Sequence, residues 1–206
     1  MVSRRAPAPE REPTAVKARI LTAARSEFAA LGLTAGSVRT IGERAGVTAA
    51  MVNYYFGGKR GLYDAVVAEA EGRLRERLLA ALTPVHERRG RSGVAALLAG
   101  AYFDFLAEER ELQRILLREV LDQGESMGEV VARHLSPLRP MFQQHFGKGD
   151  EAMHLAVSLF GAVAGWFLYE PVLASFFGAD PRSRKLRERR RQHVVQLAQT
   201  FEEMPR

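Results

Sequence analysis

Apolar residues recur at helical spacing along most of the chain, and no stretch shows the alternation of a β-strand. In the first such stretch, five apolar residues follow one another at steps of four, four, four and three: Val16, Ile20, Ala24, Phe28 and Leu31. This is the stripe of an amphipathic helix. Thr14 is expected to cap its start and Gly32 to end it in a left-handed turn. Residues 1–13 hold three prolines and mixed charge, and are expected to form a flexible tail.

Two short helices are predicted next, with hardly any turn between them. Ser37 is a good N-cap for the first, and Thr48 is a good N-cap for the second. The residues expected to face inward are Val38, Ile41, Ala45, Val52 and Phe56. Because only Gly46 and Val47 separate the first helix from the next cap, the two must cross steeply, as in a helix-turn-helix. Any corner between two helices would give the same pattern, so both DNA binding and plain helix packing stay open.

Longer helices are predicted from Lys59 onward. An apolar row indicates one helix that ends near Pro84: Leu62, Val66, Ala70, Leu74 and Leu78. Further helical stretches are predicted over residues 92–107, 109–122, 127–146, 151–170 and 183–203. Pro137 and Pro140 are expected to kink or split the stretch that contains them. The predicted class is all-α, with about nine helices.

Positive charge is concentrated near the start of the chain. The 206 residues carry a net charge of +6, and residues 1–60 alone hold ten basic and four acidic side chains, so the remainder is neutral. This asymmetry indicates a polyanion-binding head on a neutral body. A disordered basic tail would account only for Arg4, Arg5 and Arg11. A second basic run, Arg182–Arg191, is interpreted as the solvated start of the last helix, with nucleic-acid or membrane contact as the alternative.

Composition narrows the classes of protein. With 47% apolar and 26% charged residues the chain is globular. It has no cysteine, which excludes disulfides, zinc fingers and cysteine nucleophiles and fits a reducing cytoplasm, the expected location. The first dozen residues hold no apolar run, so no secretory signal is expected.

One segment has the composition of a membrane helix. Residues 152–169 form 18 consecutive positions without a charge, and Gly161 and Gly165 have the small-xxx-small spacing. Acidic residues flank the segment on both sides, and His154 and Ser158 interrupt it. A helix buried in a soluble dimer has the same properties and is the favoured interpretation. A membrane-associated protein is the alternative.

The run from Ser37 to Asp64, SVRTIGERAGVTAAMVNYYFGGKRGLYD, resembles the DNA-binding region of the TetR/AcrR family of transcriptional regulators. Its most specific parts are Ile41–Val47, Tyr54–Phe56, Lys59 and Leu62, and the resemblance covers about residues 14–75. It implies a three-helix DNA-binding head over residues 14–58 and a ligand-binding and dimerisation domain over residues 59–206. It also implies a homodimer formed through residues 151–170 and 183–203, a palindromic operator in double-stranded DNA, and a small-molecule effector that releases a repressor.

The resemblance places the recognition helix at residues 48–56. The expected DNA contacts are Ser37, Arg39, Thr40, Thr48, Ala49, Ala50, Asn53, Tyr54, Tyr55 and Lys59. Asn53 can pair with an adenine edge and Arg39 with guanine or a phosphate. Because many family members carry tyrosine at the position of Asn53, base and phosphate contact both stay open there. One of the two tyrosines could instead pack against the first helix. Lys59 opposes the dipole of its helix, which favours a phosphate contact.

Aromatic and methionine residues of the second half predict an apolar pocket, although core packing uses the same residue types. The candidates are Tyr102, Phe105, Met127, Met141, Trp166 and Tyr169, and they favour an apolar or aromatic effector. The Gly57–Lys59 run lacks the first glycine of a P-loop, and the five histidines are scattered. No enzyme, metal site or cofactor is therefore expected. A small-molecule-binding or enzymatic helical protein with an incidental basic head is the alternative.

Overall fold

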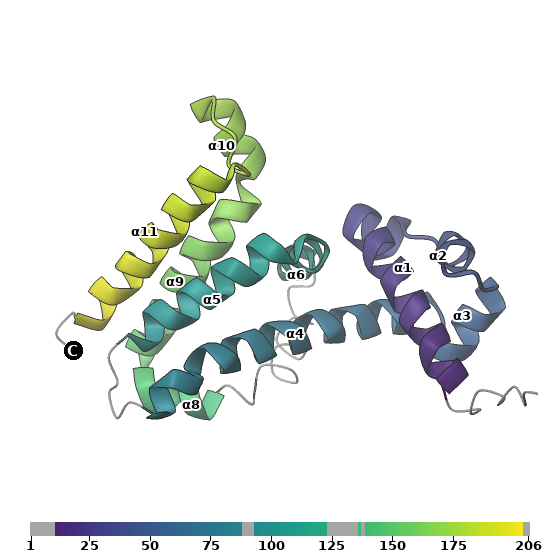
Figure 1. Cartoon of the computed structure of the whole chain (residues 1–206), viewed down its shortest axis with the longest axis horizontal. Coiled ribbons are helices and arrows are strands. Elements are labelled where there is room, and N and C mark those ends of the chain that lie inside the picture. The colour runs from purple at the N-terminus through teal and green to yellow at the C-terminus, as the bar shows by residue number, and fades with distance from the viewer. Residues whose placement is uncertain (1–10, 88–92, 123–135, 137–138, 204–206) are drawn as a thin grey trace, which may run out of the picture.

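The computed structural model describes residues 11–87, 93–122, 136 and 139–203, and all regular structure in these ranges is helical (Figure 1). The ten helices are α1 (Arg11–Ala35), α2 (Val38–Ala45), α3 (Ala49–Phe56), α4 (Lys59–Glu87), α5 (Val94–Glu108), α6 (Arg110–Asp122), α8 (Arg139–Phe146), α9 (Asp150–Leu168), α10 (Glu170–Phe177) and α11 (Arg184–Glu203). The predicted all-α class is confirmed. The first part of the predicted stretch 127–146 lies outside the described residues.

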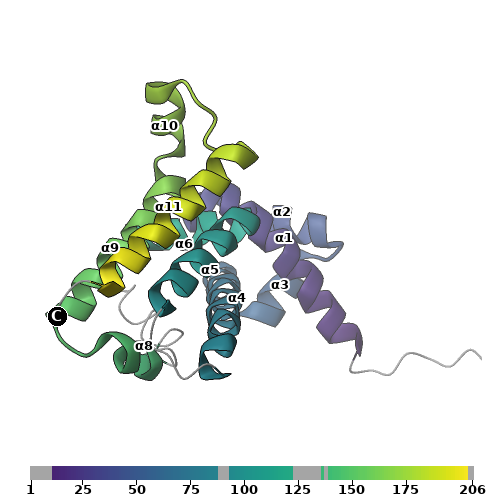
Figure 2. The ribbon, with the colours of Figure 1, turned by 60° about the vertical axis from the view of Figure 1, so that its left-hand side comes forward.

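The molecule has a small head and a larger body that are joined by a long helix. Helices α1, α2 and α3 form the head, α5, α9 and α11 lie side by side in the body, and α4 runs from one to the other (Figures 1 and 2). Each part has its own hydrophobic core. The head's core also takes in Leu62, Tyr63, Val66 and Val67 from α4 and Ile115 from α6. The packing thus places the first half of α4 with the head, beyond the predicted domain boundary at residue 58.

The predicted caps of the two short helices are confirmed. The backbone N–H of Thr40 donates to Ser37 Oγ at 3.3 Å, and that of Met51 donates to Thr48 Oγ1 at 3.2 Å. Gly46 ends α2 in the left-handed conformation, with φ 69°. Gly42 allows the turn after α2 to pack closely against this helix, because a Cβ at position 42 would meet the Val47 carbonyl oxygen at 2.9 Å. These local rules set the steep crossing of α2 and α3.

Several predicted boundaries were wrong. Helix α1 begins at Arg11 and not after Thr14. Pro13 lies in its first turn, where backbone N–H groups make no hydrogen bond within the helix, so a residue without an N–H is tolerated. Leu31, predicted to face inward, is 49% exposed, since the backbone leaves the helical conformation at the next residue, Gly32. Helix α4 continues past Pro84 to Glu87. Helix α10 was not predicted; Pro171 lies in its first turn.

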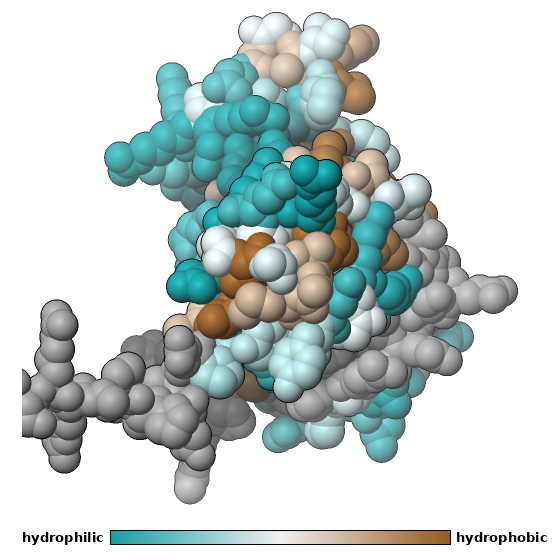
Figure 3. All heavy atoms as spheres, turned by 90° about the vertical axis from the view of Figure 1, so that its right-hand side faces the viewer, coloured by the Kyte–Doolittle hydropathy of each residue, from teal (hydrophilic) through white to brown (hydrophobic). Residues whose placement is uncertain are grey.

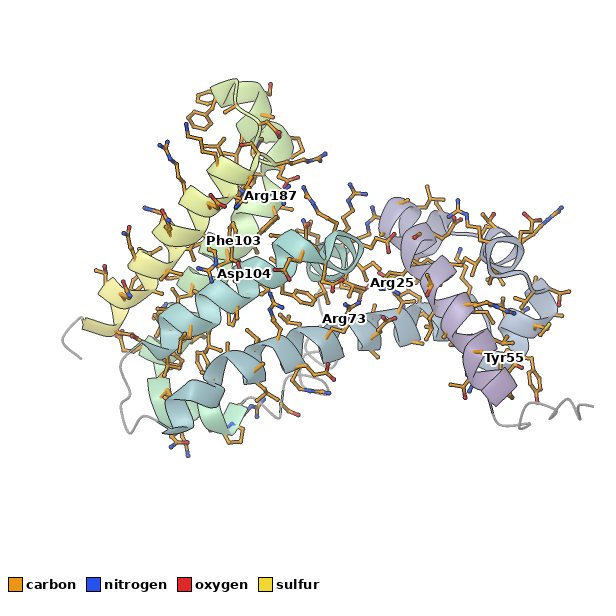
Figure 4. All side chains as sticks on the ribbon, in the orientation of Figure 1. Arg25, Tyr55, Arg73, Phe103, Asp104 and Arg187 are labelled. Carbon is orange, nitrogen blue, oxygen red and sulfur yellow. The ribbon has the colours of Figure 1, made fainter. Side chains whose placement is uncertain are left out.

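The second basic run fastens the last helix to the body. Arg191 forms two hydrogen bonds with Asp104, of 2.6 and 2.8 Å, and Asp104 lies on the side of α5 that faces α11 (Figure 4). This hydrogen bonding raises the pKa of Arg191. Arg190 donates to the Ala162 carbonyl oxygen of α9 at 2.6 Å. The run is therefore only partly the solvated helix start that the sequence predicted.

Candidate nucleic-acid interface

A buried carboxylate connects the first two helices of the head. Glu27 of α1 is 3% exposed, and its Oε1 accepts a hydrogen bond of 3.1 Å from the backbone N–H of Ser37, the residue that caps α2. Its Oε2 lies 3.2 Å from Arg44 Nη1, near the end of α2. Both ends of α2 are thus held to one side chain of α1. The sequence analysis did not identify Glu27. The pattern that could have indicated it is an acidic residue next to Phe28, on the inward side of the first helix.

Helix α3 presents small and polar side chains to solvent. Val52 is fully buried and anchors the helix in the head's core, whereas Ala50, Asn53 and Tyr54 are exposed. Tyr54 is the most exposed of these, at 84%. Apolar and weakly polar side chains gather at the centre of this end of the molecule, with hydrophilic side chains around them (Figure 3). Small side chains such as Ala50, next to hydrogen-bonding groups such as Asn53, suit close approach to the edges of base pairs.

The two tyrosines of α3 have different surroundings. Tyr55 is half-buried, packs against the head's core, and has Lys17 Nζ 5.8 Å from its ring centroid (Figure 4). Tyr54 meets the Tyr55 ring edge-on, with 5.3 Å between centroids, and stays in solvent. Tyr55 is therefore the tyrosine that packs against the first helix, and Tyr54 keeps a free hydroxyl on the exposed face.

The predicted basic contacts lie on either side of this face. Arg39 is exposed at the start of α2 and pairs with Glu43 one turn on, at 3.0 Å. Lys59 Nζ donates to the Thr34 carbonyl oxygen at 2.7 Å, which joins the start of α4 to the end of α1. This contact depends on tertiary packing and has no signal in the sequence. An ammonium has three N–H donors, so two remain for a phosphate.

The ten predicted DNA contacts lie on, or cap, three successive helices: α2, α3 and the start of α4. Ser37, Arg39 and Thr40 stand in the first turn of α2 or cap it. Thr48, Ala49, Ala50, Asn53, Tyr54 and Tyr55 lie along α3 or cap it, and Lys59 begins α4. The hydroxyl oxygens of Ser37 and Thr48 each already accept one backbone N–H, so each hydroxyl keeps its O–H as a donor and one further lone pair as an acceptor.

The predicted pocket residues are not brought together. Tyr102 lines a small apolar cavity of about 20 Å³ with Phe142, Phe146 and Phe160, and burial raises its pKa to about 12. Phe105 is buried elsewhere, at 3% exposure, and Tyr169 is 56% exposed. The guanidinium of Arg190 lies 5.8 Å from the ring centroid of Trp166. Met127 lies outside the described residues, as does the side chain of Met141.

The described part of the chain contains no group of three histidine or acidic side chains placed to hold a metal ion. Helix α9 is the one described helix that is long and apolar enough to cross a membrane, and 22% of its apolar window is buried. Core helices of soluble proteins meet the same criterion, so this is weak evidence for a membrane protein.

Comparison with known proteins agrees with the resemblance seen in the sequence. Residues 20–66 match the family model described as bacterial regulatory proteins, tetR family. The transcriptional regulator BetI of Vibrio campbellii is 29% identical over 102 residues, which are 48% of this chain and 49% of BetI. The chain thus matches about half the length of this relative.

Solved structures extend the similarity to the whole fold. A transcriptional regulator of Streptomyces coelicolor has a TM-score of 0.67 and 22% identity, over 92% of this chain and 99% of its own. The regulator FadR of Bacillus subtilis, solved in complex with stearoyl-CoA, has a TM-score of 0.62 and 19% identity, over 86% of this chain and 97% of its own. At such identities these structures support the fold: a helix-turn-helix head followed by a larger helical domain.

Proposed function

Residues 20–66 match the family model of the tetR family of bacterial regulatory proteins, and from that premise we propose that the chain is a homodimeric repressor of this family in the cytoplasm. It binds a palindromic operator and is released by a small molecule. The observation that carries the proposal is the exposed face of α3, capped by Thr48 and anchored by Val52. Asn53 and Tyr54 point their polar groups outward from it. The excess of positive charge in residues 1–60 supplies the attraction to phosphates.

The homodimer is supported by an uncovered apolar stripe on α9. Met153, Val157 and Phe160 recur at helical spacing and are 57%, 68% and 42% exposed. An adjoining side of α9 packs into the body's core through Leu159, Val163 and Phe167. Large apolar patches on a soluble surface mark interaction sites. A second copy that packs α9 and α11 against their counterparts would cover the stripe and set two heads at a fixed separation.

A dimer accounts for α9 better than a membrane does. His154 and Ser158 are exposed next to the apolar stripe, and Asp150 and Glu151 are exposed at the start of the helix. Lipid would leave these polar groups without partners, whereas a protein interface with a polar rim accommodates them.

The proposed effector is a small molecule that binds in the body. The cavity beside Tyr102 has an apolar lining, which favours an apolar or aromatic molecule. At about 20 Å³ it must widen to admit one. The stearoyl-CoA complex of FadR, a protein of similar fold, supports a small-molecule effector for this chain as well.

Selection of bound duplexes from a random DNA pool at near-physiological salt tests the proposal. The expected result is an enriched inverted repeat whose half-sites lie about 34–36 Å apart, or a multiple of this distance. Asn53→Ala is the comparison variant, and it should weaken the enrichment while it keeps its binding to random DNA. Salt-sensitive binding without any enriched sequence would contradict the proposal, because the head would then be a general polyanion-binding surface.

A further inference from the structure

A groove rich in arginine lies between α6 and the start of α10. It has a volume of about 350 Å³. Four arginines line it: Arg110, Arg114, Arg118 and Arg182. Leu117, Phe167 and Leu168 form an apolar wall on the same groove. The volume falls within the usual range for small-molecule sites, and the lining combines cationic and apolar surface.

The positive charge of the groove is only partly neutralised. Glu170 is the one carboxylate among its described lining residues. It is 6% exposed and already holds two arginines, Arg110 at 3.0 and 3.3 Å and Arg182 at 2.9 Å. Arg114 and Arg118 form no hydrogen bond or ion pair with any described residue. Two guanidinium groups in one groove therefore have no anionic partner within the described chain.

A buried amide in the same groove also lacks a partner. Gln113 is 5% exposed and lines the groove, and its Oε1 is buried without a hydrogen bond within the described chain. A buried acceptor without a donor costs about 1–3 kcal/mol, so such groups in folded proteins normally meet water or a ligand. Gln113 is thus a second sign, independent of the charge, that the groove is built to receive a molecule.

We propose that this groove binds a small amphipathic anion. Its carboxylate or phosphate would lie between Arg114 and Arg118, whose guanidinium groups bind planar oxyanions in bidentate fashion. Its apolar part would lie on Leu117 and Phe167. Gln113 would turn its buried Oε1 into the groove to accept from a hydroxyl or amide N–H of the ligand. The groove lies away from the exposed face of α3, because α6 and α3 are on opposite sides of α1 (Figure 1). A separate small anion is therefore proposed as its ligand, and not the backbone of the DNA.

Arg118 connects this groove to the DNA-binding head. Its guanidinium lies so close to Gly32 that a Cβ at that position would collide with it. Gly32 is where α1 leaves the helical conformation, two residues before the carbonyl that accepts from Lys59. A second hollow between residues 31–34 and α6 shares Arg118 and is also lined by the buried Glu119. A ligand that engages Arg118 therefore acts on the end of α1; this regulatory step rests on the function proposed above.

Calorimetry on the full chain tests the binding site. The probe is octyl phosphate, with octanol as the neutral analogue and inorganic phosphate as the anion without a tail. We expect one molecule per protomer and at least tenfold weaker binding by Arg114→Gln and Arg118→Gln. Arg189→Gln, which removes an exposed arginine of α11 outside the groove, is the matched control and should bind normally. Circular dichroism checks that each variant is folded.

Three results would overturn the binding site: unchanged affinity in both groove variants, octanol as tight as octyl phosphate, or inorganic phosphate as tight as octyl phosphate. The regulatory step is measured separately, as the shift in affinity for the selected operator. Octyl phosphate should change it at least fivefold in the wild-type chain and not in Arg118→Gln. If no operator is found but calorimetry succeeds, the proposed function fails and the site stands. If an operator is found but octyl phosphate does not bind, the site fails alone.

Discussion

Replacement of Glu27 by alanine tests whether one buried carboxylate holds the geometry of the DNA-binding head. The change leaves the Ser37 N–H without its acceptor at 3.1 Å and Arg44 without its partner at 3.2 Å. A hydrogen bond to a charged group contributes about 1.5–3 kcal/mol. The ion pair adds less than about 1 kcal/mol, because the Arg44 side chain is 53% exposed and solvent screens its charge. We therefore expect a loss of about 2–4 kcal/mol in the free energy of unfolding.

Urea unfolding, followed by circular dichroism at one fixed protomer concentration, measures this loss. Thermal unfolding should show a fall in Tm of roughly 5–12 °C. Glu27→Gln keeps an oxygen for the Ser37 N–H and should lose about 1 kcal/mol less than the alanine variant, since a neutral hydrogen bond replaces a charged one. Operator affinity should fall in both variants, because α2 and α3 lose their fixed position relative to α1.

The matched control is Glu43→Ala. Glu43 pairs with Arg39 at 3.0 Å on the exposed side of α2, and such pairs one turn apart contribute only about 0.3–0.5 kcal/mol. If Glu27→Ala is no more destabilising than Glu43→Ala, the reasoning is refuted, because burial and the bond to the cap of α2 would then contribute nothing.

Three further changes test the proposed interface and dimer. Arg39→Ala and Asn53→Ala should each lower the preference for operator over random DNA by about 1–3 kcal/mol in competition binding, and equal losses on both DNAs would exclude base reading. Lys59→Ala should reduce the slope of log affinity against log salt by about 0.9, whereas an unchanged slope would show that the bond to Thr34 is the only role of this lysine. Val157→Asp should convert the dimer to a monomer in sedimentation and weaken operator binding; a dimer that persists would place the interface elsewhere.

The elements that sequence could predict are those determined by local rules. Ser37 and Thr48 are recognisable as caps because each is a short hydroxyl side chain directly before a segment with apolar residues at helical spacing. Such a hydroxyl accepts a hydrogen bond from a backbone N–H of the first turn. Gly46 directly follows the first short helix that the sequence predicts, and it ends α2 with a positive φ. Neither prediction requires any knowledge of the rest of the fold, and together they define the helix-turn-helix.

The contacts that sequence could not predict join segments far apart in the chain. The bond from Lys59 to the Thr34 carbonyl depends on how α4 meets the end of α1. Residue type made Tyr102 and Trp166 candidates for an apolar pocket, but it did not predict which neighbouring helix each side chain would meet. Tyr102 lines the apolar cavity, whereas Trp166 lies beneath Arg190. A face can therefore be predicted from one helix, whereas a pocket requires several helices placed together.

Helix α6 is the element through which a ligand in the body could act on the head. Its Ile115 is 1% exposed within the head's core, while Leu112, one turn earlier, is 1% exposed within the body's core. Glu111 of the same helix faces Arg25 of α1 across the junction, at 3.9 Å (Figure 4). Because side chains on one rigid helix cannot move independently, a shift of α6 with the body must displace Ile115 in the head or open one of the two cores. A ligand bound in the groove along α6 is therefore well placed to alter the position of α1 and, through Glu27, that of α2, which packs against α3.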